Sequence, residues 1–389
     1  MTTPLAPRKV GLVLCLVGVA VFLLAGWGLW RDVEWLAQPF YAYAWWSYIL
    51  FLDGFCVLRR GHSLLTTRRR FVFSLCLWST SFWFFFELLN LRFQNWYYVG
   101  VFRVTSLVDF VGGGVFAVVC FSTVFVGLFE TYEALTATGL WRSRGERRSS
   151  RVLPRPVSYA VQAFGVAMAL SAILFPYYLA PLIWGSFTFL VDPWNYRRGH
   201  RSLLRDIEAR DWGLMARLFL AGLVCGLVWE SCNFFAPQKW IYTVRGLEGL
   251  KLFEMPLLGF LGFPGLAYDS VGAFALLSSF FLGGATWEHP GDLAYSIERR
   301  PAAPRRVFWG AACLQPVFWL VVSLLMVDVD GFKQINDRYG HLAGDQYLVE
   351  ITNAIREQLR RADLACRYGG DEFCILLPET ELEGARAIA

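Results

Sequence analysis

Long apolar runs separated by short arginine-rich loops constrain the fold of this chain more than any other feature of its sequence. A helix that crosses a bilayer needs about 20 mostly apolar residues. Charged residues form only 17% of the 389 residues, whereas soluble proteins carry about 25%. We therefore predict a multi-span α-helical membrane protein. The candidate spans are 10–30, 40–58, 71–91, 106–129, 157–176, 178–194, 213–235, 256–284 and, as a candidate ninth span, 307–325.

The positive charges are distributed unequally between the loops on the two sides of these spans. The N-terminus and the loops after the second, fourth, sixth and eighth spans hold 22 Lys and Arg residues, whereas the opposite loops hold 6. Cytoplasmic loops are enriched in Lys and Arg, so we predict a cytoplasmic N-terminus and a location in a bacterial inner membrane. The net charge of +5 comes from these loops. It indicates a lipid bilayer as partner and no nucleic acid.

The membrane region also repeats its own polar residues in the same order. Trp45 to Asp53, with Arg59-Arg60-Gly61-His62 after it, matches Trp184 to Asp192 with Arg197-Arg198-Gly199-His200. A second matched pair is Glu87-x-x-Asn90 with Gln94, Trp96 and Tyr98, and Glu230-x-x-Asn233 with Gln238, Trp240 and Tyr242. The offset between matched residues is 138 to 144 positions. We predict two tandem four-helix repeats of the same orientation.

This pattern divides the chain into seven consecutive regions. They are a cytoplasmic N-terminus (1–9), membrane repeat 1 (10–140), an arginine-rich cytoplasmic loop (141–156), membrane repeat 2 (157–285), a basic loop (286–306), the apolar segment 307–325, and a C-terminal α/β segment that overlaps its end (323–389).

Four of the matched polar residues form a candidate site within the membrane. Glu87 and Glu230 lie near the ends of long apolar helices, and Asn90 and Asn233 follow one turn later on the same faces. A carboxylate in hydrocarbon costs at least about 2.5–3.5 kcal/mol, so it usually faces a bundle interior or a watery cavity. One interpretation is a pseudo-symmetric site for a ligand, a proton or an ion. The other is that these residues only join helices.

The sequence changes character from about residue 323. Ser323 to Val329 reads as a buried strand that ends in acidic residues, and 344–361 has the spacing of an amphipathic helix. Gly369 and Gly370 then separate two short apolar runs, which is typical of a hairpin. Such a hairpin can pair beside the strand and bring Asp371 close to Asp328. Two converging carboxylates suit Mg²⁺ with substrate phosphates, and Glu372 adds a third acid.

The residues of this segment resemble the GGDEF family of diguanylate cyclases. The matching motifs are Asp328-x-Asp330-x-Phe332-Lys333-x-x-Asn336, Gly340-His341-x-x-Gly344-Asp345 and Gly369-Gly370-Asp371-Glu372-Phe373. The resemblance covers 323–389 and implies a truncated α/β domain like the nucleotidyl cyclases. It also implies GTP as substrate, cyclic di-GMP as product, Mg²⁺ or Mn²⁺ as cofactor, and a homodimer.

The resemblance implies a role for each matched residue. Asp328, Asp371 and the Val329 carbonyl hold metal, and Glu372 with Asp371 is catalytic, Glu372 as the base. Substrate contacts are implied for Phe332, Lys333, Asn336, Asp345, Gly369 and Gly370, and an inhibitory product site for Arg360 and Asp363.

The segment departs from the family at both of its ends. The family's opening turn is replaced by the apolar run 307–325, and its later strands and basic phosphate contacts are absent up to Ala389. We therefore expect little or no cyclic di-GMP from these residues alone. Nine spans would also place the segment outside the cytoplasm, where GTP is absent. Two other functions stay open: a membrane transport or sensor protein with a non-catalytic GGDEF fragment, and a membrane-embedded enzyme that uses the repeated Glu and Asn residues.

Overall fold

The structure is a computed structural model that describes residues 5–100, 107–141, 153–244, 250–289, 292, 293, 295, 297, 322–328, 341–359, 364–367 and 372–378. The chain divides into two compact units, Met1–Ala303 and Pro304–Ala389.

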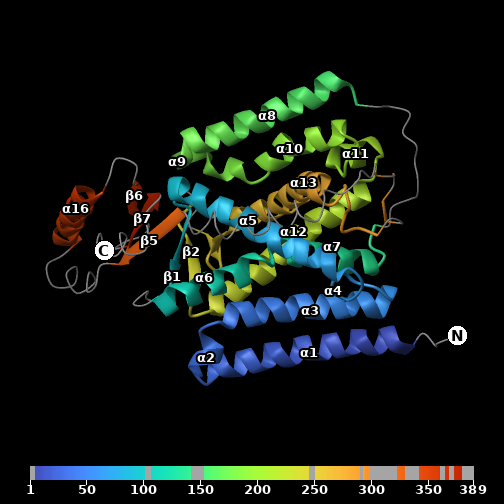
Figure 1. The fold of residues 1–389 in the computed structure, drawn as a ribbon, viewed down its shortest axis with the longest axis horizontal. Helices are drawn as coiled ribbons and strands as arrows, with labels where there is room; N and C mark the ends of the chain where they lie inside the picture. Colours follow the sequence, from blue (N-terminus) through green and yellow to red (C-terminus); the bar gives the residue numbers. More distant parts are fainter. Residues whose placement is uncertain are drawn as a thin grey trace. The chain divides into compact units, whose positions relative to one another are not determined.

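The first unit is mostly helical (Figure 1). Its longer helices are α1 (Leu5–Trp30), α3 (Phe40–Arg60), α5 (Arg69–Phe93), α6 (Leu107–Phe121), α7 (Val124–Ala137), α8 (Arg155–Leu174), α10 (Ser186–Arg197), α12 (Trp212–Phe235) and α13 (Gly262–Phe281). Short elements connect them: helices α2 (Glu34–Ala37), α4 (Leu64–Thr67), α9 (Pro176–Leu179) and α11 (Leu203–Glu208), 3-10 turns at Ala180–Ile183 and Leu257–Leu261, and strands β1 (Trp96–Val99), β2 (Lys239–Tyr242), β3 (Lys251–Leu252) and β4 (Met255–Pro256).

Six stretches of the described chain are long and apolar enough to cross a membrane. They are Pro7–Trp30, Phe71–Phe93, Gly112–Ala137, Arg155–Leu174, Trp212–Phe235 and Leu257–Phe281. Each overlaps one of the predicted spans. Two further predicted spans of this unit are not among the six. Segment 40–58 is helical as part of α3, but it is rich in Tyr and Trp and carries Asp53.

The prediction of one span over 178–194 is wrong. Pro181 lies in a 3-10 turn, and Gly185 has a φ of +96°, a left-handed conformation that interrupts a helix. The segment is therefore divided into α9, the 3-10 turn and the 12-residue α10.

The candidate ninth span ends within a strand of the second unit. Val322–Asp328 forms strand β5, so residues 322–325 belong to a sheet, while 307–321 lie outside the described residues. A strand that is buried on both faces is also continuously hydrophobic, so its sequence can resemble that of a membrane-spanning helix. A single helical span over all of 307–325 is therefore not what the structure shows.

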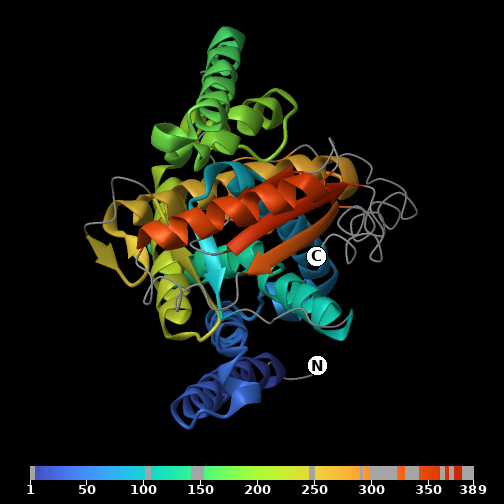
Figure 2. The same ribbon diagram turned by 90° about the vertical axis from the view of Figure 1, so that its left-hand side faces the viewer.

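The long helices of the first unit lie roughly side by side. Figures 1 and 2 show α1 on one outer side with α3 next to it, α8 on the opposite side with α10 next to it, and α5, α7, α12 and α13 between them. Glycines allow the outer pairs to approach closely. A Cβ on Gly18 of α1 would lie 2.8 Å from the Ser47 carbonyl oxygen of α3, and one on Gly165 of α8 would lie 2.4 Å from the Leu190 amide of α10.

Strands β1 and β2 form a two-stranded antiparallel sheet that joins the two halves of the first unit. The register pairs Trp96 with Tyr242 and Tyr98 with Trp240. Trp96 and Trp240 occupy matched positions in the sequence, as do Tyr98 and Tyr242. Each tryptophan therefore pairs with the tyrosine of the matched sequence segment.

The described part of the second unit is a three-stranded antiparallel sheet and one helix. The strands are β5, β6 (Leu364–Arg367) and β7 (Glu372–Pro378), in the order β5-β7-β6. Helix α16 (His341–Gln358) lies between β5 and β6 in the sequence. Leu348 of α16 and Phe373 of β7 form the buried core of this unit, and Ile351 and Ile355 pack against it. The predicted strand, helix and hairpin thus all correspond to observed elements.

Candidate functional site

The end of the sheet in the second unit brings together two of the predicted acidic residues. Asp328, the last residue of β5, is paired in register with Glu372, the first residue of β7. On the other side of β7, Arg367 of β6 pairs with Phe373. The four residues 368–371 connect β6 to β7, so Asp371 directly precedes the position paired with Asp328. The backbone register therefore places Asp328 and Glu372 at the same end of the sheet.

Helix α16 holds β7 in place beside this sheet end. Phe373, next to Glu372 in the chain, is 2% exposed and packs in the core with Leu348 of the helix. Ile375, two residues further along β7, is 1% exposed. Burial of such side chains contributes about 1.5–3 kcal/mol each. The strand that begins with Glu372 is thus anchored immediately after the predicted base.

The remaining predicted residues of this site divide into two groups. Asp345 lies in the first turns of α16. The others lie outside the described residues, and their roles stay predictions: Val329, Phe332, Lys333, Asn336, Arg360, Asp363, Gly369, Gly370 and Asp371.

The donor groups predicted at this sheet end fit a magnesium ion. Asp328 and Asp371 supply carboxylates and Val329 supplies a backbone carbonyl, so every donor is an oxygen. Mg²⁺ prefers oxygen ligands and is usually held by one or two carboxylates together with substrate phosphates. In the sequence, Val329 directly follows Asp328, and Asp371 directly precedes Glu372, with which Asp328 is paired.

Comparison with known protein families identifies the class of domain to which this sheet and helix belong. Residues 320–389 match the family model described as "Diguanylate cyclase, GGDEF domain". The match covers the whole described part of the second unit, with its sheet, its helix and the paired acidic strand ends. The C-terminal segment is therefore a partial GGDEF domain, as its motifs predicted.

Individual relatives match over the same segment. The chain is 50% identical over 68 residues to "Diguanylate cyclase A" of Treponema denticola, a match that covers 18% of each chain. It is 51% identical over 65 residues to "Diguanylate cyclase DgcP" of Pseudomonas aeruginosa, over 17% of this chain and 10% of that protein. It is 47% identical over 68 residues to "Response regulator PleD" of Caulobacter vibrioides, over 18% and 15%. The chain thus matches less than a fifth of the length of each of these relatives.

In the first unit, Asn90 and Asn233 have equivalent structural roles. The Asn90 side-chain amide donates to the Trp96 carbonyl at 2.7 Å, and its oxygen accepts from the Asn95 amide at 2.9 Å. Asn233 donates to the Trp240 carbonyl at 2.8 Å and accepts from the Trp240 amide at 2.9 Å. Each asparagine therefore ties the end of its helix, α5 or α12, to the strand that follows.

The two glutamates of the predicted membrane site lie beside the same small sheet. Glu87 accepts from the Tyr98 hydroxyl at 2.6 Å and from the Trp83 indole at 2.8 Å. Glu230 accepts from the Tyr242 hydroxyl at 2.9 Å. The structure thus connects all four predicted residues to β1 and β2. These contacts explain why the same order of residues occurs twice in the chain, since they join helices to strands. A ligand role for these residues stays a prediction.

Removal of either asparagine should destabilise the first unit. In Asn90→Ala and Asn233→Ala, buried backbone groups lose their partners, at a cost of about 1–3 kcal/mol for each group. Glu34→Ala is a suitable control because Glu34 is exposed on α2, and its expected effect is within about 0.5 kcal/mol. Unfolding in detergent, followed by circular dichroism, measures the difference. Equal stability of Asn90→Ala and Glu34→Ala would refute the structural role.

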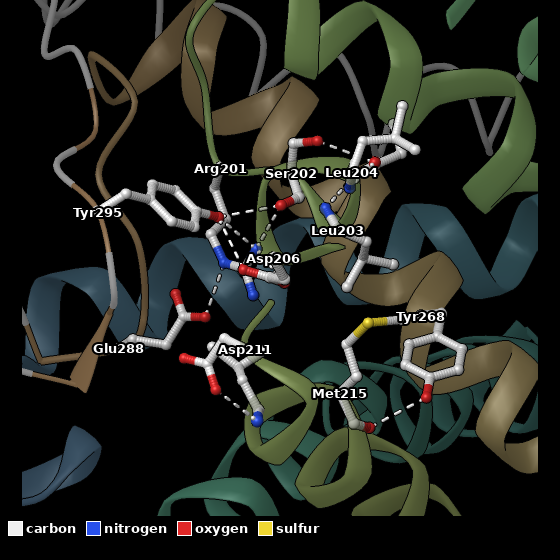
Figure 3. A network of polar contacts seen from close by, with 12 residues as sticks. Arg201, Ser202, Leu203, Leu204, Asp206, Asp211, Met215, Tyr268, Glu288 and Tyr295 are labelled. Carbon is white, nitrogen blue, oxygen red and sulfur yellow. Dashed lines mark hydrogen bonds and ion pairs between the residues drawn. The ribbon is translucent and has the colours of Figure 1, made fainter. Parts of the chain in front are cut away.

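A buried ion network that the sequence pattern did not single out lies beside helix α11. Arg201 is 1% exposed, and Figure 3 shows its guanidinium between Asp206, Glu288 and Tyr295. Arg201 donates to Asp206 and to Glu288, each at 2.8 Å, and to the Tyr295 hydroxyl at 2.8 Å. The Tyr295 hydroxyl lies 3.0 Å from the second Asp206 oxygen, to which it donates.

The sequence contains only a weak signal for this network. By position, Arg201 is one of the loop arginines whose number indicates the cytoplasmic side, and the spacing of five residues to Asp206 is common. Burial raises the pKa of Asp206 and of Glu288, and the Arg201 guanidinium opposes this rise in both. The positive charge of Arg201 therefore stabilises the ionised forms of Asp206 and Glu288.

Proposed function

We propose that this protein is a membrane-anchored, diguanylate cyclase-like signalling protein that joins two GTP molecules into cyclic di-GMP and releases pyrophosphate. The observation that carries the proposal is the pairing of Asp328 with Glu372 at one sheet end, within a segment that matches the GGDEF family model. The named diguanylate cyclases among the relatives support it over the same residues.

The proposed roles follow the motifs. Glu372 takes the proton of the attacking ribose hydroxyl. Asp328, Asp371 and the Val329 carbonyl would hold Mg²⁺, which neutralises phosphate charge when bound. Phe332, Lys333, Gly369 and Gly370 would lie along the phosphates, whereas Asn336 and Asp345 would read the guanine. Because each domain carries one GTP, the proposed active form is a homodimer, and Arg360 with Asp363 would bind product.

Nucleotide binding and product formation together test this proposal. The purified chain in detergent should bind a non-hydrolysable GTP analogue only with Mg²⁺ or Mn²⁺ present, and should not bind the ATP analogue comparably. Asp328→Asn should weaken the metal-dependent binding. Labelled GTP should be converted slowly to cyclic di-GMP. Absence of both binding and product would contradict the proposal.

We also propose that the first unit lies in the membrane as two related four-helix repeats. The six apolar stretches support membrane insertion by their length and composition. Matched contacts support the repeat: Asp53 accepts from the Ser63 hydroxyl at 2.8 Å, and Asp192, 139 positions later, accepts from the Ser202 hydroxyl at 2.9 Å. The order of long and short helices before β1 also resembles the order before β2.

Cysteine labelling should establish the orientation. In a chain whose native cysteines are replaced by alanine, Arg198→Cys should react from the cytoplasmic side, and Trp35→Cys from the opposite side. Both native side chains are exposed, so the reagent can reach each position. The measurement is maleimide labelling of intact cells and of inverted vesicles. Labelling of position 198 in intact cells would reverse the proposed orientation.

A second candidate function is a multi-pass sensor or transport protein whose GGDEF segment does not turn over GTP. Its candidate residues are Glu87 and Glu230, which accept hydrogen bonds from matched tyrosines, Tyr98 and Tyr242. Metal-dependent GTP binding without product would favour this candidate over the cyclase.

A further inference from the structure

Two carboxyl groups meet inside the first unit, away from the sites described above. Asp53 of α3 and Glu130 of α7 are both 0% exposed. The two helices pack against each other, and the two carboxyl groups are close enough to interact electrostatically. Asp53 is well bonded, since one oxygen accepts from the Ser63 hydroxyl and the other from the Leu65 amide, each at 2.8 Å. Neither oxygen of Glu130 makes a hydrogen bond of good geometry among the described residues, although the Leu64 amide at the start of α4 lies beside it.

Another buried carboxyl group of the first unit, that of Asp269, does have hydrogen-bond donors. Asp192 lies 139 positions after Asp53, and Asp269 is a buried residue of α13. Asp269 accepts from the Gly185 amide at 2.7 Å, the Thr188 amide at 2.6 Å and the Thr188 hydroxyl at 2.7 Å. These amides are free because α10 begins at Ser186, and the first amides of a helix have no partner within it.

Helix α3 offers no such amides to Glu130. It begins at Phe40, so its residues near Asp53 are in the helix interior and their amides are already bonded. Glu130 therefore faces a carboxylate and has one amide, that of Leu64, beside it, whereas Asp269 accepts from three donors. An unpaired carboxylate in a dry interior is very costly, and a second one beside it adds repulsion.

No cation in the described surroundings is available to neutralise Glu130. On α3 the neighbouring groups are Asp53 and Cys56, and on α7 the neighbour is Glu133. On the packed helix α12, Arg217 donates to the Leu140 and Trp141 carbonyls and to Tyr132, and Cys225 contacts Thr131. Arg60 is bonded to Glu133 and Asp292, and Arg68 to the carbonyls of Thr286, Trp287 and Glu288.

We propose that Asp53 and Glu130 form a proton-binding site, in which Glu130 holds the proton and donates it in a hydrogen bond to Asp53. The proton removes one of the two negative charges and gives Glu130 a hydrogen bond to Asp53. Among the described residues, no group of three His, Cys, Asp or Glu side chains is placed to hold a metal ion.

The site is connected to the segment that leads out of the first unit. Glu133, one turn after Glu130, is bonded to Arg60 at 2.9 Å, and Arg60 is bonded to Asp292 at 2.5 Å. Phe129, next to Glu130, stacks on Trp287 with ring centroids 4.1 Å apart. Loss of the proton would add negative charge beside Glu133 and so compete for Arg60. Protonation therefore affects how firmly Asp292 is held by Arg60.

Infrared difference spectroscopy of the full chain in lipid nanodiscs tests this proposal directly, and its outcome does not depend on nucleotide chemistry. A pH increase should remove the carbonyl stretch of one protonated carboxyl. This band should be absent in Glu130→Gln, whose amide can still donate to Asp53. Asp53→Asn should shift the band, because the acceptor loses its charge, and this readout remains if Glu130→Gln does not fold.

Asp192→Asn and Asp269→Asn are the controls, since both are buried carboxyl groups of the same unit that accept hydrogen bonds, and in both the band should persist. Two outcomes would overturn the proposal. One is a band that is unchanged in both Glu130→Gln and Asp53→Asn. The other is a band that disappears at constant pH when sodium chloride replaces a salt of a bulky organic cation, which would show a sodium site instead.

Discussion

Glu372→Gln is expected to lower the rate of cyclic di-GMP formation by about 10²–10⁴-fold, the range typical for loss of a general base. Glutamine has nearly the same shape but cannot accept a proton from the ribose hydroxyl. The backbone pairing with Asp328 does not involve the side chain, so the sheet end should persist. GTP binding should therefore change little while turnover falls. Initial rates from chromatographed, labelled product measure the effect.

Glu357→Gln is the matched control, since Glu357 is an exposed carboxylate of α16 in the same unit. It should retain the rate of the unaltered chain within about two-fold, because surface substitutions away from a site have small effects. An equal loss in both variants would mean that the unit is merely sensitive to charge. A full rate in Glu372→Gln would remove Glu372 from the proposed role of base.

Arg201→Met should lower the free energy of unfolding of the first unit by about 3–5 kcal/mol, the usual cost of removing one partner from a buried ion pair. Methionine fills part of the space but leaves Asp206 and Glu288 without their shared cation. Burial would then act unopposed on both carboxyl groups and raise their pKa further. Both would take up protons, which lowers the cost but leaves their hydrogen bonds incomplete.

The comparison with Arg59→Met separates burial from loss of charge. Arg59 is exposed at the end of α3 and belongs to the same set of cytoplasmic-side arginines, so its replacement should change stability by less than about 0.5 kcal/mol. Unfolding in mixed micelles of increasing sodium dodecyl sulfate, followed by circular dichroism, measures both variants. A similar, small effect in both would show that the Arg201 network contributes little.

Part of this architecture could be predicted from the sequence because the physical cause is local. Runs of about 20 apolar residues favour helices that can cross a bilayer. Six of the predicted spans coincide with apolar helical stretches of the structure. The Gly369-Gly370 pair between apolar runs correctly indicated the β6–β7 hairpin. The GGDEF motifs were specific enough to identify the C-terminal segment.

Other features could not be predicted because they depend on the tertiary structure. The residues 322–325 read as the end of a span, and only their pairing with β7 shows that they form a strand. Arg59 and Arg201 are indistinguishable as loop arginines, yet one is exposed and the other is 1% exposed. Glu130 and Asp269 are both acids within apolar helices. The start of α10 supplies three hydrogen-bond donors to Asp269, which the sequence alone does not show.

The central claim is that the paired acidic strand ends in the second unit carry out cyclase chemistry on GTP. A single time course with labelled GTP and Mg²⁺ tests it most directly, with the unaltered chain and Glu372→Gln in parallel. The unaltered chain should form cyclic di-GMP and pyrophosphate slowly, and Glu372→Gln should form at least about a hundredfold less. Labelled GTP that stays bound but unchanged in both, or product formed equally by both, would contradict it.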